Sequence, residues 1–418
     1  MQAILTERAG AWPAIPAPVV PHRTLPPQPP LPRIKVLHVV TRFWGGSGLN
    51  TLMTALGMDP DRYEVWVAGV PGDELWDRAA AKGVHTVQIP GFRDVLTPAD
   101  ALVLWRLVRL IRRERFTIVH THNAKGGFLG RLAARLCRTP VVVHTFHAIS
   151  FHDHMPRWRR ALYRSLERVV SRFAHAYLAV APRLALETVH QRLAPPGSVE
   201  VVPSGVDLAA IPEGFDPACR QTLGVPEGIT LIGTVGRLVY QKAPLDFVRM
   251  AALVHGRYPE TAFVIVGDGP LADEVRRLAA DLGVDVHITG WRPDAHRLAA
   301  GLDVFVMPSL YEGMGRALTE ALAAARPVVA TAVNGVPDLV EPGATGLLVA
   351  PSDPGGLARA VGWLLDHPDE ASAMGRQGRV RARAAFSRDA MCAAVDACYR
   401  RLLALPGPQS PSGGLSCG

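Results

Sequence analysis

The 418-residue chain is too long for one compact domain, since a domain holds about 100–200 residues, and its 48% hydrophobic and 20% charged residues exclude disorder throughout. The net charge of +8 is unevenly placed: residues 31–200 hold 24 basic and 13 acidic residues, whereas residues 201–418 hold 19 and 23. A first half with such a basic excess suggests an anionic partner, either a nucleic acid or a membrane surface.

The two ends of the chain have the composition of disordered segments. Residues 1–33 contain nine prolines and little apolar periodicity, and residues 405–418 are rich in Pro, Gly and Ser. Such segments cannot bury enough apolar surface to form a core. We therefore predict a disordered extension and a disordered tail, neither of which is needed for the chemistry of the protein.

From residue 34 to residue 204, short apolar runs alternate with helical segments. Runs of this length are typical of parallel strands that are buried on both faces. The expected strands are 34–40, 63–70, 84–90, 116–122, 140–146, 176–180 and 198–203, and helices are expected near 72–82, 97–114, 125–137, 157–174 and 182–192. This alternation predicts an α/β domain with helices on both faces of a parallel sheet.

The same alternation restarts in residues 205–385. Five Pro and five Gly in residues 196–228 place a boundary there. The expected strands of this second α/β domain are 229–236, 262–269, 284–290, 303–309 and 327–333. Because ligands bind outside the carboxyl ends of parallel strands, the two domains should face each other across a cleft that holds the active site.

The segment from Ser309 to Glu320 carries the strongest local signal. It follows an expected strand, opens a helix, and holds two carboxylates eight residues apart, Glu312 and Glu320. Glycines at a helix N-terminus let backbone amides approach a phosphate, and a carboxylate there can accept hydrogen bonds from sugar hydroxyls. A loop carboxylate and a solvated helix carboxylate would give the same pattern.

Arg237 and Lys242 follow the strand 229–236. Two cations at a strand end suit the charges of a diphosphate, although a surface basic pair would look the same. Lys242 is the only lysine after residue 200 in a chain whose basic residues are almost all Arg, which favours a required point charge.

Two glycine-rich turns are weaker signals. The segment Gly45–Gly48 either binds a phosphate or only forms a tight turn between a strand and a helix. The segment Gly267–Ala272 fits the dinucleotide pattern G-x-G-x-x-A, but Pro270 removes one amide that would bind pyrophosphate. We therefore do not predict nicotinamide binding.

Six of the 15 histidines lie within residues 120–154. His120 and His122 end one expected strand, and His144 and His147 end the next. Few carboxylates and no cysteines accompany them, so contact with substrate is favoured over a metal site.

Two expected helices, 101–116 and 156–173, are basic and amphipathic. They contain five and six Arg, respectively, together with aromatic and aliphatic residues. They are ordinary outer helices or lie on an anionic membrane surface. Nucleic acid is disfavoured because no nucleic-acid motif accompanies the charge.

Taken together, the ordered motifs resemble glycosyltransferase family 4, the retaining GT-B enzymes, over residues 34–403. The carriers are the motifs GGSG, HTFH, PSGVD, GRLVYQK and VGDGP and the E-x7-E element, at residues 45–48, 144–147, 203–207, 236–242, 266–270 and 312–320. The resemblance implies two Rossmann-like α/β domains and a C-terminal helix, 386–404, that crosses back to the first domain. Met314 replaces a frequent Phe and Arg316 a frequent aliphatic residue, which leaves the donor preference open.

The resemblance also implies roles on the donor side. Arg237 and Lys242 would neutralise the donor diphosphate and stabilise the leaving nucleoside diphosphate. Glu320 would bind the ribose, and Glu312 would contact and orient the donor sugar. The amides of Gly313, Met314, Gly315 and Arg316 would contact sugar and phosphate.

Three more positions are implied by the same resemblance. Gly46 would let the first domain's loop reach the diphosphate, the main chain around Trp291 would contact the base, and His147 would lie near the reacting sugar on the acceptor side. The resemblance also implies attack on the same face of the sugar, with the donor phosphate accepting the acceptor's proton, and therefore no enzyme nucleophile.

We thus expect a retaining, metal-independent enzyme without a cofactor. It would move a sugar from a UDP- or GDP-sugar to a lipid-linked saccharide in cell-surface polysaccharide or glycolipid synthesis. A 2-epimerase, a sugar phosphorylase or a non-catalytic nucleotide-sugar-binding protein of the same fold stay open. The scattered cysteines and the absence of a secretory signal and of an apolar run of 18 residues predict a cytoplasmic protein. The two basic helices predict peripheral contact with the inner face of the membrane.

Overall fold

A computed structural model describes residues 33–71, 74–93, 95–149, 151, 155–226 and 228–404. The predicted disordered tail, 405–418, and residues 1–32 of the predicted extension lie outside these described residues, as do His152 and His154. The described residues belong to one compact unit, so the division at residue 204/205 stays a prediction.

The first sheet has seven parallel strands in the order β3-β2-β1-β4-β5-β6-β7. In that order they are His85–Gln88, Tyr63–Pro71, Ile34–Phe43, Ile118–His122, Val141–Phe146, Ala176–Ala179 and Val199–Val201. All seven were expected from the apolar runs. The sheet turns its direction of growth between β1 and β4, which is where ligands bind in folds of this kind.

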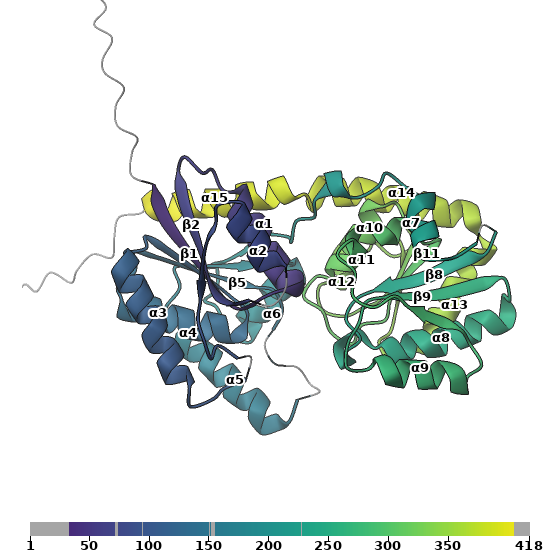
Figure 1. The fold of residues 1–418 in the computed structure, drawn as a ribbon, viewed down its shortest axis with the longest axis horizontal. Coiled ribbons are helices and arrows are strands. Elements are labelled where there is room, and N and C mark those ends of the chain that lie inside the picture. The colour runs from purple at the N-terminus through teal and green to yellow at the C-terminus, as the bar shows by residue number, and fades with distance from the viewer. Residues whose placement is uncertain are drawn as a thin grey trace, which may run out of the picture. The chain divides into compact units, whose positions relative to one another are not determined.

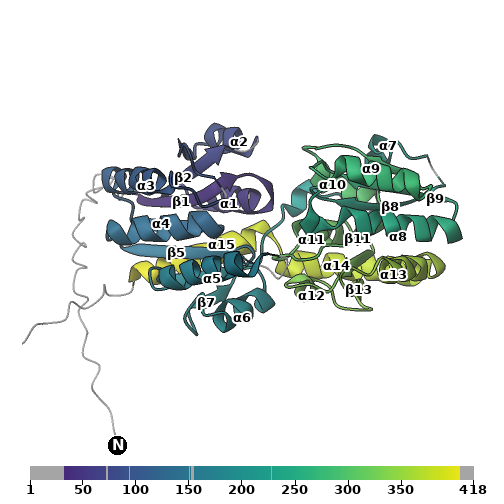
Figure 2. The same cartoon turned by 90° about the horizontal axis from the view of Figure 1, so that it is seen from below.

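Alternate residues of the central strands face different helices, as the period of two requires. The helices that follow these strands are α1 (Gly45–Gly57), α2 (Leu75–Ala81), α3 (Asp100–Glu114), α4 (Ala124–Leu136), α5 (Arg157–Val170) and α6 (Pro182–His190). Leu37 and Val39 of β1 pack with residues of α3 and α4, whereas Val36 and Val40 pack with residues of α1, α2 and the C-terminal helix α15 (Arg388–Ala404). Figure 1 shows α3, α4 and α5 together on one side of this sheet, and Figure 2 shows the same layers from below.

The second sheet has six parallel strands in the order β10-β9-β8-β11-β12-β13. These are Val286–Ile288, Thr261–Val266, Thr230–Val235, Val304–Met307, Val328–Thr331 and Leu347–Val349. Five were expected. The edge strand β13, three apolar residues of intermediate exposure, was not predicted.

Helices cover both faces of the second sheet as well. The helices α8 (Pro244–Arg257), α9 (Ala272–Asp281) and α13 (Pro354–Asp366) pack on one face through a single apolar cluster. The helices α11 (Arg316–Ala323), α12 (Val336–Leu339) and α14 (Pro368–Ala385) contribute to the cluster on the other. The short helices α7 (Pro217–Thr222) and α10 (Ala295–Leu298) and the 3-10 turns η1 (Leu208–Ala210), η2 (Tyr240–Lys242) and η3 (Ala299–Gly301) complete the elements of the described residues.

The C-terminal helix α15 packs on the first sheet, although it follows the second sheet in the chain. Its Asp396 accepts a hydrogen bond from the Tyr63 hydroxyl (2.7 Å), and Met391, Val395 and Tyr399 are buried in the same apolar cluster as β1. Figure 1 shows the helix running along that sheet. No helix among the described residues is both long and apolar enough to cross a bilayer.

Candidate functional site

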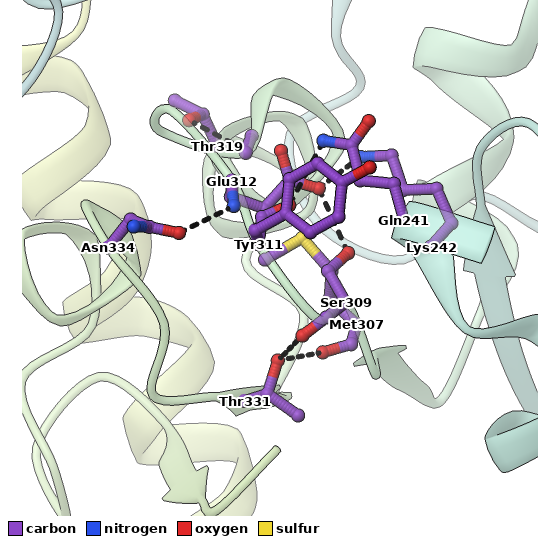
Figure 3. A network of polar contacts seen from close by, with 10 residues as sticks. Gln241, Lys242, Met307, Ser309, Tyr311, Glu312, Thr319, Thr331 and Asn334 are labelled. Atoms are coloured by element: carbon purple, nitrogen blue, oxygen red, sulfur yellow. Dashed lines mark hydrogen bonds and ion pairs between the residues drawn. The ribbon is translucent and has the colours of Figure 1, made fainter. Parts of the chain in front are cut away.

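The loop between β11 and α11 holds a buried polar network at its centre. Glu312 is 8% exposed and forms an ion pair with the ammonium of Lys242. The Ser309 hydroxyl donates to the same carboxylate oxygen of Glu312 (2.9 Å), and the backbone amide of Glu312 donates to Asn334 Oδ1 (3.0 Å). Figure 3 shows Lys242, Ser309 and Asn334 converging on Glu312. The structure thus brings together two residues that were predicted for the site, from loops that follow β8 and β11.

Further hydrogen bonds fix this loop to its neighbours. The Gln241 side-chain amide donates to the carbonyl of Tyr311 (3.0 Å), and the Leu310 amide donates to the carbonyl of Gln241 (2.8 Å). The Thr331 hydroxyl donates to the carbonyl of Ser309 (2.5 Å). Lys242 and Ser309 thus hold the carboxylate of Glu312, and Asn334 holds its backbone amide, so that the side chain is preorganised.

The second predicted cation, Arg237, lies in the same loop as Lys242 but is exposed. Its guanidinium lies over the indole of Trp44, 4.9 Å from the ring centroid, and the guanidinium of Arg42 lies 5.7 Å from the same ring. Trp44 directly precedes α1, and the predicted residue Gly46 is exposed in the first turn of that helix. Trp44 was missed at the sequence level; its place beside the Gly-rich turn was the available signal.

The start of α11 explains the glycine before it. Gly315 has φ +89°, a backbone conformation that side chains other than glycine's rarely adopt, and the helix begins at the next residue, Arg316. Glu320 therefore lies in the second turn of the helix. It is 6% exposed and pairs with Arg316 Nε (2.9 Å), whose Nη1 also donates to the carbonyl of Gly205 (3.0 Å).

Gly313 is required by a close approach of backbones. A β-carbon at this position would lie 1.6 Å from the carbonyl oxygen of His147, far inside any allowed contact. The neighbouring Met314 is buried, and its sulfur accepts a hydrogen bond from the Ser204 amide (3.3 Å). The predicted residues His147 and Gly313 are thus in contact through their backbones.

Trp291 follows β10 and is 61% exposed. Within the described part of the chain, no hydrogen bond or ring contact joins it to the other predicted site residues. Its role toward the base stays a prediction.

The glycines of the dinucleotide-like segment have a packing role. A β-carbon on Gly267 would lie 2.0 Å from the carbonyl oxygen of Gly236, and one on Gly269 would lie 2.6 Å from that of Leu238. The segment thus supports the loop that carries Arg237 and Lys242, which accounts for its glycines without a nicotinamide cofactor.

The histidines divide between the two faces of the first sheet. His38, His120 and His122 lie on the face that α15 covers, where His120 Nδ1 is 2.6 Å from the Tyr399 hydroxyl. His144 lies on the opposite face, where a β-carbon on Gly127 of α4 would touch its ring. His38 was not among the predicted residues, although β1 is adjacent to β4 and pairs His38 with His120.

A row of hydrogen bonds connects three of these rings. His38 Nδ1 is 2.9 Å from His122 Nε2, and His122 Nδ1 is 3.1 Å from His147 Nε2. Burial lowers the pKa of His38 to about 3 and that of His147 to about 4, and it lowers the pKa of His120, His122 and His144 well below the usual value. These rings are therefore neutral at pH 7.

His38, His120 and His122 are also the residues that could hold a metal, since each offers a ring nitrogen within 4.8 Å of the others. This set differs from the four histidines considered from the sequence. The nitrogens of His38 and His122 that face each other are already joined by a hydrogen bond, and each nitrogen of His120 has a hydroxyl partner. Metal independence stays a prediction.

Comparison with protein families gives two matches along the chain. Residues 44–210 match the family described as "Glycosyltransferase Family 4", and residues 229–367 match "Glycosyl transferases group 1". Each match covers most of one of the two sheets.

Two similar proteins illustrate the relatives. The chain is 32% identical over 272 residues, 62% of its length and 69% of the relative's, to the "UDP-Gal:alpha-D-GlcNAc-diphosphoundecaprenol alpha-1,3-galactosyltransferase" of Escherichia coli. It is 31% identical over 331 residues, 73% of its length and 81% of the relative's, to the "GDP-mannose-dependent alpha-(1-6)-phosphatidylinositol monomannoside mannosyltransferase" of Mycolicibacterium smegmatis.

Solved structures show the same fold at lower identity. Anabaena HepE in complex with UDP and glucose superposes with a TM-score of 0.76 at 20% identity, covering 88% of this chain and all of that one. WaaG, a glycosyltransferase involved in lipopolysaccharide biosynthesis, superposes with a TM-score of 0.71 at 18% identity, covering 87% of this chain and 99% of that one. The predicted GT-B fold is confirmed.

Proposed function

This chain belongs to glycosyltransferase family 4 and is a glycosyltransferase, and from that premise we propose that it transfers a sugar from a UDP- or GDP-sugar to a lipid-linked saccharide with retention of configuration. The observation that carries the proposal is the buried network of Lys242, Glu312 and Ser309 at the carboxyl ends of β8 and β11. Donors of both nucleotide types occur in the names of the two relatives.

The two cations have complementary tasks toward a diphosphate. Lys242 is held by Glu312, but an ammonium has three N–H donors and can keep this partner while it binds a phosphate oxygen. Arg237 is exposed and presents a guanidinium that suits bidentate contact with a second phosphate. Together they stabilise the charge that develops on the leaving nucleoside diphosphate, so we propose that the reaction needs no metal ion.

Glu312 is suited to orientation of the sugar. Its carboxylate already accepts from Ser309 and pairs with Lys242, which holds it in one position and reduces its strength as a nucleophile. We assign it hydrogen bonds to hydroxyls of the donor sugar, with the donor phosphate accepting the acceptor's proton. Glu320 would bind the ribose, and its pairing with Arg316 presets the direction of its carboxylate.

The outer helices of the first sheet support an acceptor held at a membrane. Trp105 of α3 and Trp158 of α5 are 54% and 71% exposed, and Leu102 and Leu162 are exposed on the same helices. Arginines interleave with these side chains, as on helices that lie on anionic lipid. The diphosphoundecaprenol acceptor in the name of the E. coli relative is consistent with this arrangement, and we place the enzyme in the cytoplasm at the inner face of the membrane.

A panel of nucleotide sugars tests the proposal. Binding to the native state raises the melting temperature, so the nucleotide sugar with the largest shift identifies the donor. That donor is then assayed for transfer to a polyprenyl-diphosphate-linked sugar in vesicles. NMR of the product determines its anomeric configuration. Lys242→Ala should abolish transfer, whereas Arg276→Ala, on the surface of α9, should not. No shift and no turnover with any nucleotide sugar would contradict the proposal, and a product formed without acceptor would indicate an epimerase.

A further inference from the structure

Three histidine side chains form a line from the interior of the first sheet to the predicted site. His38 is 0% and His122 1% exposed, whereas His147 is half-buried and its carbonyl touches Gly313. The two hydrogen bonds of 2.9 and 3.1 Å join Nδ1 of one ring to Nε2 of the next at both steps. The rings of His122 and His147 are nearly parallel, with an interplanar angle of 29°.

Neutral rings make this line directional. A neutral imidazole has one N–H and one lone pair, so each ring donates at one nitrogen and accepts at the other. Two arrangements are possible. In the first, all three rings are protonated at Nδ1, and the free Nδ1 of His147 is an N–H donor. In the second, all three are protonated at Nε2, and the free Nδ1 of His147 is a lone pair. The tautomer of one ring sets that of the other two.

The blind end of the line decides between the two arrangements. His38 Nε2 is buried and has no hydrogen-bond partner among the residues that the structure describes. With all protons on Nε2, this nitrogen would carry a buried N–H without an acceptor, and such orphaned donors are rarer in proteins than under-satisfied acceptors. The arrangement with protons on Nδ1 leaves only a lone pair there and is favoured.

We propose that His122, directed by His38, is a positioning residue that holds His147 as the Nδ1–H tautomer, so that His147 donates a hydrogen bond to an oxygen of the sugar or phosphate and does not act as a base. The proposal rests on the proposed function, in which the donor phosphate takes the acceptor's proton. The low pKa of His147, which follows from burial, agrees with a weak base.

A metal ion bound by His38, His120 and His122 is the competing interpretation of the same cluster. It would break one of the two hydrogen bonds of His122, to His38 or to His147, because both ring nitrogens of His122 are engaged, and it would compete with the hydroxyl partners of His120. The three-residue group contains no carboxylate to offset a divalent charge in a buried place. The hydrogen-bonded line accounts for more of the geometry.

Nitrogen NMR of the full chain tests the proposal directly. In protein labelled with ¹⁵N-histidine, the two ring nitrogens give different shifts for the protonated and unprotonated states, and single substitutions assign the three rings. We expect His38, His122 and His147 all to be protonated at Nδ1. A proton on Nε2 of His147 or His122 would overturn the inference, as would a Zn²⁺ ion that binds the chain at 1:1 and is lost in His38→Leu.

Two variants of similar size separate positioning from packing. His122→Leu removes the donor to His147, so the His147 nitrogens should lose their fixed tautomer and kcat should fall about tenfold, the worth of one neutral hydrogen bond, while KM for the donor stays within about twofold. His122→Asn can place an amide N–H where Nδ1–H was and should restore both readouts. Equal behaviour of the two variants, or unchanged His147 shifts in His122→Leu, would contradict the inference.

The control is His144→Leu, which removes an equally buried ring on the opposite face, where His144 Nδ1 contacts the Thr121 hydroxyl (2.9 Å). It should leave the His147 shifts unchanged. Wild-type protein that transfers no sugar defeats the proposed function, while its NMR spectrum still decides the histidine line. Protein that transfers sugar with His147 protonated at Nε2 defeats only the inference.

Discussion

Replacement of Lys242 and Glu312, singly and together, separates the contribution of their ion pair to stability from the contribution of Lys242 to donor binding. Lys242→Met leaves the carboxylate of Glu312, whose side chain is 7% exposed, with the Ser309 hydroxyl as its remaining side-chain partner. Breaking a buried pair costs about 3–5 kcal/mol, and because the Lys242 side chain is 23% exposed we expect a smaller loss, about 2 kcal/mol in the free energy of unfolding. Glu312→Gln leaves an ammonium that can reach water, and it should cost about 1 kcal/mol.

The double variant Lys242→Met/Glu312→Gln leaves no unpaired charge. Its free energy of unfolding should lie within about 1 kcal/mol of the wild-type value, since the effects of substituting two residues that contact each other are not additive. Donor binding should not recover, because a hydrogen bond from the ammonium to a phosphate is worth about 1.5–3 kcal/mol, a loss of about 10–100-fold in affinity. Urea-induced unfolding and donor titrations measure the two quantities. A double variant destabilised by the sum of the single losses, or one that binds donor as wild type does, would refute this reasoning.

Four further outcomes are expected. Gly313→Ala should lower transfer at least tenfold and destabilise the loop, since its β-carbon would overlap the carbonyl of His147; wild-type activity would show that the two backbones separate freely. Glu167→Gln removes the anionic partner of Arg131, a fully buried residue of α4, and should lower the free energy of unfolding in urea by about 3 kcal/mol. A loss below about 1 kcal/mol would speak against a buried ion pair. Trp158→Glu should weaken sedimentation with anionic vesicles about tenfold and leave transfer to a water-soluble acceptor unchanged; equal sedimentation would remove α5 from the membrane contact. Because the folded-state pKa of His38, about 3, lies below the usual 6.5, the unfolded chain binds more protons between these values, so stability should fall as the pH drops below about 6.5. His38→Leu should reduce this slope, to which other buried histidines with a lowered pKa also contribute, and a slope equal to wild type would contradict it.

The sequence was sufficient for the parts of the molecule that depend on periodicity. The strands at the centre of the first sheet, such as β4 and β5, are buried apolar runs that could be located one by one, and the restart of the alternation indicated a second sheet. The edge strand β13 was not predicted, whereas β7, which is equally short, was included in the longer expected strand 198–203.

The site was predictable where chemistry and chain order coincide. Glu312 and Lys242 each follow a strand, and parallel strands bring their carboxyl ends to one edge, so their meeting could be anticipated. The histidine line could not. It depends on which face of the sheet each ring takes and on His38, which is 84 residues from its partner His122 in the chain. Spacing along the sequence carries no information on such a contact until the strand order is known.

The docking of α15 on the first sheet has a consequence for synthesis of the chain. Domains generally fold as units during translation, with the N-terminal one first. Here the face of the first sheet that carries His38 and His120 is closed by Met391, Val395 and Tyr399, which leave the ribosome only after the whole second sheet has been made. The first half must therefore wait with an uncovered apolar face, and a fragment that ends before α15 should aggregate or need a chaperone where the full chain does not.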